Sequence, residues 1–193
     1  MGDSYTESYR DLYHGTTKTN AEKIIAMQMF KPSDTGWCGK GVYFYDIKAK
    51  AWWSADRTCR RSNIKDAPAI VVADIKDIKR VEVLDLRSFQ DLSKFEKFVT
   101  SFLTESGGKI DIVEAKNEDD RVRQLRELFL NFYCSEKEIK LIIGHFKQVE
   151  RVEFDVNFAE EWQLVIGIET IYCVKDTQII SNIRGRQSNG HFI

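Results

Sequence analysis

The sequence has few of the features that build metal sites, disulfide frameworks or membrane spans. It contains four cysteines in 193 residues, and no two of them form a C-x-x-C pair. This spacing argues against a zinc site and against a dense disulfide framework, so reduced thiols in the cytoplasm are the simplest interpretation. No apolar run reaches transmembrane length, and the first ten residues lack the apolar core of a signal peptide. We therefore expect a cytoplasmic protein without a metal and without a membrane partner.

Net charge is also nearly absent. The 29 Lys and Arg residues are balanced by 30 Asp and Glu residues, which leaves a net charge of -1. Such a chain has no overall attraction to nucleic acid, so any binding of that kind must use a local patch. The composition, 42% hydrophobic and 31% charged, is ordinary for a soluble globular protein, and the length favours one domain.

The period of the apolar residues changes twice along the chain. Strand-like runs occupy 9–14, 42–45, 69–75 and 81–86, and strand patterns return over 152–158, 164–174 and 177–183. Between them the period is helical. We therefore predict one α+β domain over residues 1–193, with a mainly antiparallel sheet and a helical insertion at about 89–149.

Three helices are expected in this insertion. The first carries Phe95, Phe98 and Phe102 on one face and ends at Gly107-Gly108, and the second carries Val122, Leu125, Phe129 and Phe132. For the third, Ser135 and Glu138 have capping-box spacing, and Ile139, Ile142, Ile143 and Phe146 form the apolar face.

The stretch from Trp37 to Tyr45, WCGKGVYFY, is the most informative one. Gly39 and Gly41 precede a strand-prone run, and Asp46 follows as a potential cap for a helix over 47–61. Glycines at such a junction let the backbone approach a ligand closely, and Tyr43 offers a flat face for a ring. The alternative is a plain turn with Tyr43 and Phe44 in the core.

Two further residues have the character of site residues. Glu169 lies inside the apolar run LVIGIETIYCV, where a carboxylate is costly unless it is paired or faces a site. There it could stabilise a developing positive charge, whereas on an edge strand it would simply face water. His14 is followed by Gly15, and together they offer an imidazole and an accessible backbone for an amide and a sugar hydroxyl. The alternative for His14 is a structural role.

Together these segments resemble the His-Tyr-Glu ADP-ribosyltransferases, the class of the poly(ADP-ribose) polymerases and diphtheria-toxin-like enzymes. The resemblance rests on His14-Gly15-Thr16, on GKGVYF at 39–44 and on Glu169, which opens ETIYCVKDTQII. It covers Tyr9 to about Leu86 and Gln163 to Ile183. It implies an ADP-ribosyltransferase-like fold with a split, mainly antiparallel β core, and NAD as co-substrate.

The resemblance also implies roles for individual residues. The backbone of Gly15 would hold the nicotinamide carboxamide, His14 a ribose hydroxyl on the adenosine side, and Tyr43 would stack on the nicotinamide ring. Glu169 would bind the nicotinamide ribose and stabilise the positive charge that develops there. The expected catalytic residues are Glu169, His14 and Tyr43; the expected NAD-binding residues are His14, Gly15, Thr16, Gly41, Tyr43, Phe44 and Trp53.

The chain departs from the family pattern in the helix after Tyr43. Members often carry a serine that contacts the carboxamide and an aromatic residue three positions later. Here those positions are Ala51 and Ser54, and Trp53 takes the stacking role only if the helix is shifted by one residue.

The expected function is a mono-ADP-ribosyltransferase that cleaves NAD and modifies a protein or a nucleic acid. By analogy with the family it suits a bacterial toxin or phage-defence effector, with an antitoxin or inhibitor protein as a partner. Arginines at 57, 60, 61, 184 and 186 make a nucleic-acid acceptor plausible, although they could also form a solvated face. Four alternatives remain open: an inactive NAD- or ADP-ribose-binding module, an NAD glycohydrolase, an RNA 2′-phosphotransferase, and a thiol enzyme with Cys38 as nucleophile and His14 as base.

Overall fold

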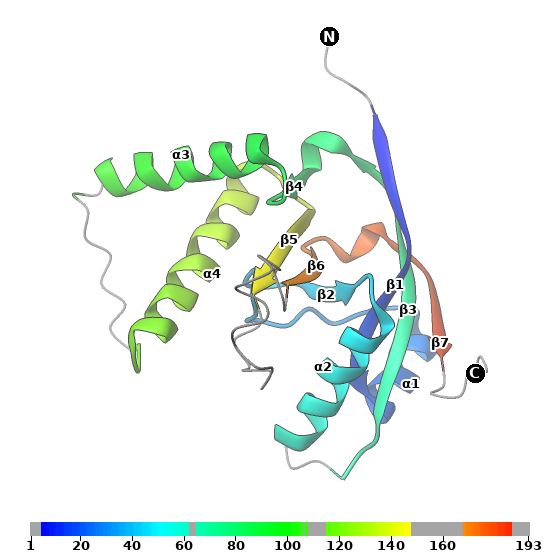
Figure 1. Ribbon diagram of the computed structural model, residues 1–193. Helices are drawn as coiled ribbons and strands as arrows, with labels where there is room; N and C mark the ends of the chain where they lie inside the picture. The colour runs from blue at the N-terminus through cyan, green and yellow to red at the C-terminus, as the bar shows by residue number, and fades with distance from the viewer. Residues whose placement is uncertain (1–4, 62–64, 106, 108–114, 148–167, 187–193) are drawn as a thin grey trace, which may run out of the picture.

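A seven-stranded sheet with four helices forms the structure, a computed structural model that describes residues 5–61, 65–105, 107, 115–147 and 168–186 (Figure 1). The first elements are β1 (Thr6–Thr17), α1 (Lys18–Met27), β2 (Val42–Tyr45), α2 (Lys48–Arg61) and β3 (Pro68–Lys79). They are followed by η1 (Arg80–Glu82), β4 (Val83–Asp85), α3 (Phe89–Glu105) and α4 (Glu118–Glu136). The last are β5 (Leu141–Lys147), β6 (Ile168–Val174), η2 (Thr177–Ile179) and β7 (Ile180–Arg186).

The sheet has the order β4-β5-β6-β2-β1-β3-β7, and only the β4–β5 pair is parallel. This confirms the expected α+β class and the mainly antiparallel sheet. Strands β1 and β2 share a single registered pair, Tyr13 opposite Tyr45, whereas β1 pairs with β3 along most of its length. The sheet therefore has a four-stranded half, β4-β5-β6-β2, and a three-stranded half, β1-β3-β7, which meet at a narrow seam.

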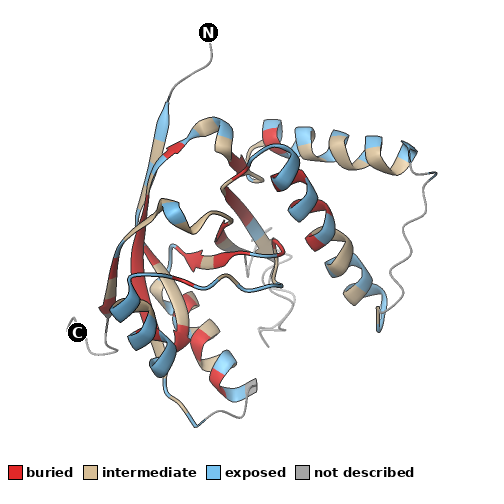
Figure 2. Ribbon diagram, turned by 180° about the vertical axis from the view of Figure 1, so that it is seen from behind, coloured by how far each residue is buried: buried red, intermediate tan, exposed pale blue. Residues whose placement is uncertain are grey.

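Helices cover both faces of the sheet. On one face Phe44 and Val71 pack with Ala21 of α1, and on the other Tyr45 and Val72 pack with Ala51 of α2. Successive residues of a strand point to opposite faces, so strands covered on both sides consist of continuous apolar residues. Figure 2 shows this burial along the central strands.

The helical insertion is shorter than predicted. Helices α3 and α4 confirm the first two predicted helices, and they pack through aromatic pairs such as Phe98 with Tyr133, whose ring centroids lie 5.0 Å apart. The third predicted helix, over 135–146, is wrong, because residues 141–147 form β5 inside the sheet. Leu141, Ile142 and Ile143 are all completely buried, which is the pattern of a strand covered on both faces and not of an amphipathic helix.

Two other predicted strands differ in detail. In the run 81–86 the first residues belong to the 3₁₀ turn η1, and the strand is limited to Val83–Asp85. The run 164–174 is described from Ile168, as β6, while the predicted strand over 152–158 lies outside the described residues. Among the helices that the structure describes, none has both the length and the apolarity needed to cross a membrane.

Candidate functional site

His14 lies at the seam between the two halves of the sheet. Beyond the Tyr13–Tyr45 pair the described parts of β1 and β2 have no further registered pairs, and His14 Nδ1 lies 2.8 Å from the carbonyl oxygen of Tyr43. A carbonyl only accepts hydrogen bonds, so Nδ1 carries the proton and Nε2 of the neutral ring is an acceptor. Burial lowers the pKa of His14, which favours this neutral form at neutral pH. Nε2 is thus an acceptor on a ring that packs against Phe30 and Phe44, with centroid distances of 5.2 and 5.7 Å.

Tyr43 is held at both ends. Its backbone receives the His14 hydrogen bond, and its hydroxyl donates to the carbonyl of Gly39 and accepts from the backbone N–H of Cys38 at 3.1 Å. Its half-buried ring packs with Trp37 and Phe146 against the core on the α2 face of the sheet. Burial raises the pKa of the phenol, so the hydroxyl remains a donor. The ring position is therefore fixed before any ligand arrives.

Lys175 holds the loop that precedes β2. Its Nζ donates to the carbonyl of Cys38 at 2.6 Å, to the carbonyl of Lys40 at 2.7 Å and to Asn131 Oδ1 at 2.9 Å. These three bonds use all three donors of the ammonium group. Asn131 Oδ1 also accepts from the backbone N–H of Lys40 at 3.0 Å. Helix α4 and the end of β6 thus fix the glycine-rich loop, and no pattern in the sequence marked Lys175 or Asn131 for this role.

The glycines of the predicted motifs lie close to other parts of the chain. A Cβ on Gly15 would lie 1.9 Å from the carbonyl oxygen of Ala51, and a Cβ on Gly41 would lie 2.5 Å from Cys173 Sγ. Gly39 has φ +76, a conformation that favours glycine. From the sequence we predicted that a ligand would approach the backbone at these glycines. In the structure, protein groups from α2 and β6 make use of it.

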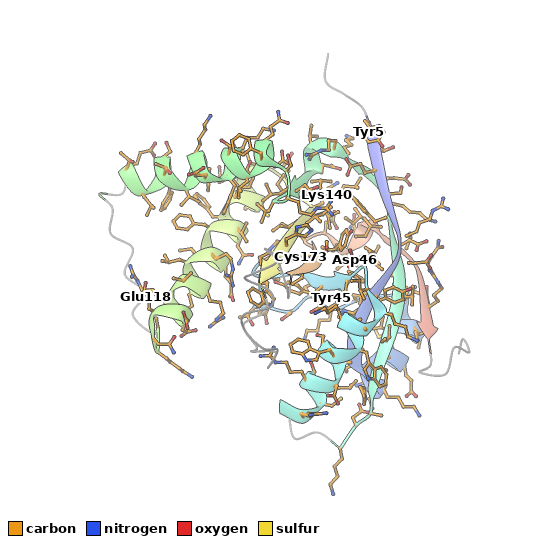
Figure 3. All side chains as sticks on the ribbon, viewed as in Figure 1. Tyr5, Tyr45, Asp46, Glu118, Lys140 and Cys173 are labelled. Atoms are coloured by element: carbon orange, nitrogen blue, oxygen red, sulfur yellow. The ribbon has the colours of Figure 1, made fainter. Side chains whose placement is uncertain are left out.

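Position 169 lies in an interior strand. Glu169 is opposite Phe146 of β5, and on the other side of β6 Ile171 and Cys173 are opposite Tyr45 and Tyr43. The alternative of an edge strand is therefore wrong. Strand alternation places position 169 on the face that also carries Tyr43 and Tyr45, about 13 Å along β6 from the Cys173–Tyr43 pair. Tyr45 and Cys173 lie close together in the centre of the molecule (Figure 3).

The remaining predicted NAD-binding residues lie in different environments, and some of them are buried. Thr16 is buried in β1, and Phe44 is buried on the face where its ring lies 5.7 Å from that of His14. In α2, Ala51 and Ala55 are buried towards the sheet, and Trp53 lies about 160° around the helix from Ala55. The structure thus brings His14 to the backbone of Tyr43, but the two rings lie on opposite faces of the sheet, His14 with Phe44 and Tyr43 with Tyr45. It does not bring Trp53 to them.

Arg126 is a site residue that the sequence analysis missed. From α4 its Nε donates to the carbonyl of Trp37 at 2.9 Å, and its guanidinium carbon lies 5.0 Å from the Trp37 ring centroid and 5.9 Å from that of Phe146. Burial lowers its pKa, although a guanidinium remains charged in proteins. No ion pair of Arg126 occurs within the part of the chain that the structure describes. The available signal was an arginine inside the apolar stripe of α4, four residues after Val122 and three before Phe129.

The buried thiols of Cys38 and Cys134 do not have the character of nucleophiles. Cys38 is completely buried, and burial raises the pKa of its thiol well above the usual value. Burial likewise raises the pKa of Cys134 to about 12. His14, the proposed base of a thiol enzyme, bonds to the Tyr43 carbonyl through Nδ1. These observations disfavour the thiol-enzyme alternative, and the described residues contain no group of three or more side chains able to hold a metal ion.

Comparison with known proteins gives little information about function. No known protein family and no solved structure matches the chain. An uncharacterized protein of Methanocaldococcus jannaschii is 36% identical over 67 residues, which is 33% of this chain and 31% of that protein. The chain therefore spans about a third of the length of this relative, and the similarity assigns it to no characterised family.

Proposed function

We propose that this protein is an NAD-dependent mono-ADP-ribosyltransferase with a macromolecular acceptor. The observation that carries the proposal is the seam, where His14 of β1 bonds to the backbone carbonyl of Tyr43 of β2, with position 169 on Tyr43's face of the adjacent strand β6. These residues come from three short motifs that are far apart in the sequence. The two-part, mainly antiparallel sheet also agrees with the core that the family resemblance implies.

The residues at the seam fit the parts of NAD. The neutral His14 ring offers Nε2 to a ribose hydroxyl on the α1 face of the sheet, and the fixed Tyr43 ring offers a flat face to the nicotinamide on the α2 face. NAD would therefore have to extend through the seam to reach both rings. Because β1 and β2 have no registered pairs beyond Tyr13 among the described residues, the seam also offers backbone near Gly15 to a carboxamide. Of the predicted set, this arrangement does not use Trp53, nor the buried residues Thr16, Gly41 and Phe44.

The proposed chemistry is substitution at a ribose carbon. When bound, NAD supplies a carbon whose bond to the nicotinamide nitrogen breaks with the electron pair leaving on nicotinamide, while an acceptor oxygen or nitrogen bonds to that carbon and releases a proton. Glu169 would hydrogen-bond the adjacent ribose hydroxyl and stabilise the positive charge that develops at the carbon. Lys175 and Asn131 would keep the loop, and through it Tyr43, in the geometry that binding requires.

The direct test is incubation of the protein with whole-cell extract and NAD that is radiolabelled in the adenylate phosphate. We expect label in a macromolecule and release of nicotinamide, with Glu169→Gln as the inactive control. Label only in free ADP-ribose would identify an NAD glycohydrolase. NAD binding without any consumption would identify an inactive binding module, and either result would overturn the proposal.

A toxin or phage-defence role is tested in cells. We expect induced expression of the protein to arrest growth of a bacterial host, and Glu169→Gln to relieve the arrest because the modification stops. Growth arrest by both proteins would show that toxicity does not depend on the proposed reaction. An inhibitor protein would be recognised by its ability to suppress the arrest when it is expressed with the active chain.

A further inference from the structure

Two arginine–tryptophan stacks lie outside the catalytic residues. In α2 the guanidinium carbon of Arg57 lies 4.9 Å from the Trp53 ring centroid, and from α4 that of Arg126 lies 5.0 Å from the Trp37 ring centroid. All four residues are half-buried. A guanidinium over an aromatic face is a favourable contact that also holds the charge in a fixed position.

The Arg126 stack lies beside the proposed active site, and the Arg57 stack belongs to α2, a helix that covers the same face of the sheet. Trp37, Tyr43 and Phe146 pack against the same core as Ala51, which belongs to α2, so they lie on the α2 face of the sheet. Helices α4 and α2 approach the central strands β2 and β6 from two different directions (Figure 1).

The strand order separates the Arg126 stack from the end of the site at which the resemblance puts adenosine. Phe146, which Arg126 contacts, lies in β5, directly opposite Glu169. His14 lies in β1, three strand positions away, which corresponds to about 14 Å at the usual strand spacing. Arg126 is thus on the Glu169 side of the proposed site, away from His14.

Helix α2 carries a local excess of positive charge. Over Lys48–Arg61 the helix carries five basic residues and one acidic residue, Asp56, although the whole chain has a net charge of -1. Asp56 is paired with Arg60 at 2.9 Å. This is the local basic patch that a chain without net positive charge needs for binding a polyanion.

We infer that the two stacks bind a single-stranded nucleic acid, which is the acceptor of ADP-ribose. The inference rests on the proposed function for the transfer, but not for the binding. Guanidinium groups contact phosphates and indole faces stack on bases, which is the combination used for single strands. An acidic peptide would use the guanidinium groups but would have no use for the two indole faces. In the transfer a nucleotide oxygen or nitrogen bonds to the ribose carbon and loses a proton, and nicotinamide leaves with the electron pair.

The test uses fluorescence anisotropy with short labelled DNA and RNA single strands over a range of salt concentrations. Arg57→Gln and Arg126→Gln should each weaken binding at least about tenfold, as expected when a charged hydrogen-bonding partner is removed. Each should also reduce the slope of log affinity against log salt by about 0.7 for every phosphate that the variant no longer neutralises. Arg126→Lys keeps the charge and should restore most of the slope.

Arg121→Gln is the matched control, because it removes an arginine of the same helix whose Nη1 lies 3.2 Å from Glu118 and which is on another side of α4. This variant should bind like the unchanged protein. Equal affinity in Arg57→Gln, Arg126→Gln and the unchanged protein would overturn the inference. So would arginine-dependent binding of an aspartate- and glutamate-rich peptide in place of the oligonucleotide.

Nicotinamide release in the absence of oligonucleotide separates this inference from the proposed function. Arginine-dependent oligonucleotide binding without nicotinamide release under any condition would support the binding surface and overturn the transferase. Nicotinamide release without any oligonucleotide binding would overturn the binding surface and support the NAD chemistry. Transfer of label from NAD to the oligonucleotide, abolished in Arg126→Gln, is the result expected if both are right.

Discussion

The two halves of the sheet each contain a polar network, and the two networks are centred on opposite charges. In the four-stranded half, the Lys175 ammonium group is surrounded by two carbonyl oxygens and one amide oxygen. In the three-stranded half, the buried Asp74 carboxylate accepts from the backbone N–H of Asp11 at 3.0 Å, from Asn182 Nδ2 at 2.7 Å and from Arg184. The first network contains no carboxylate among the described residues, whereas the second is centred on one.

The networks also hold different kinds of structure. Lys175 fixes a loop, and that loop fixes Tyr43. Asp74 fixes strands that depart from regular geometry: Asp11 and Asn182 have φ of 54 and 50, and the register shifts beside both Asp11 and Asp74. We infer that the Lys175 network positions the candidate site, whereas the Asp74 network stabilises irregular strands of the sheet. The following predictions separate these two roles.

The largest expected effect is on chemistry alone. Glu169→Gln keeps the size and hydrogen bonding of the side chain but removes the negative charge, which matters most when positive charge develops on the ribose. We expect ADP-ribose transfer to fall about 100- to 1000-fold while NAD affinity is largely kept. Label transfer and isothermal titration with NAD measure the two effects.

Tyr43→Ala is the comparison for this variant, because it removes a contact made in the ground state as well and should weaken NAD affinity more visibly. Full transfer activity of Glu169→Gln would show that the catalytic assignment is wrong. Loss of folding together with NAD affinity would show that Glu169 is structural.

The next largest effect is expected from the loop that precedes β2, which Lys175 holds in place. Lys175→Met removes three hydrogen bonds and releases the loop from α4, so NAD affinity should fall about tenfold and the free energy of unfolding by about 1–2 kcal/mol. Lys140→Met is the matched control, since the Lys140 carbonyl also bonds to the backbone N–H of Lys175 but its side chain pairs with Glu82 at 2.9 Å and not with the loop carbonyls. If both variants bind NAD equally well, the Lys175 network does not position the site.

The Asp74 network should affect stability without affecting chemistry. Asp74→Asn removes the charge that Arg184 and the donors surround, so we expect a loss of about 1–2 kcal/mol in denaturant unfolding. The kcat of the folded protein should stay within about twofold, as for any change remote from the site. A selective loss of kcat would contradict the division into two roles.

Acid should weaken the same network. Burial alone would raise the pKa of Asp74, but hydrogen bonds from Asn182 and the Asp11 amide, together with Arg184, lower it overall. Its contribution to stability is therefore complete above about pH 3.9, the usual value in an unfolded chain, and is lost as the pH falls through the lower folded-state value. Unfolding measured against pH should show a flatter acid limb in Asp74→Asn than in the unchanged protein.

The smallest expected effect is at Cys38. Its thiol is buried and its pKa is raised, so Cys38→Ala should change transfer activity by no more than about twofold. Label transfer by the variant measures this directly. Loss of all activity with the fold intact by circular dichroism would restore the thiol-enzyme alternative.

The sequence predicted elements best where one period was sustained. The strand at Val42–Tyr45 and the helix after it agree with the structure, because the glycine loop and the helical pattern of α2 have only one reasonable interpretation. The segment around Ile142 and Ile143 was misassigned, since short apolar runs fit a helix face and a strand buried on both sides equally well. Only its partners β4 and β6 decide between the two, and they are distant in sequence.

The candidate site was predictable to the extent that motifs carry it. The contact between His14 and Tyr43 was expected from two motifs, but the hydrogen bond that joins them depends on the divergence of β1 from β2. Lys175, Asn131 and Arg126 act through contacts between elements far apart in the chain, and no local pattern encodes such contacts. The glycines were singled out for the right property, close approach, although protein groups are the ones that approach.

The narrow seam between β1 and β2 couples ligand binding to the thermal stability of the protein. One registered pair and the His14 hydrogen bond connect the two halves there, so the sheet is least reinforced where the proposed ligand binds. A ligand that contacts both His14 and Tyr43 would add further contacts between the two halves. Its binding free energy is then added to the cohesion of the whole sheet, and the melting temperature rises with the concentration of the ligand.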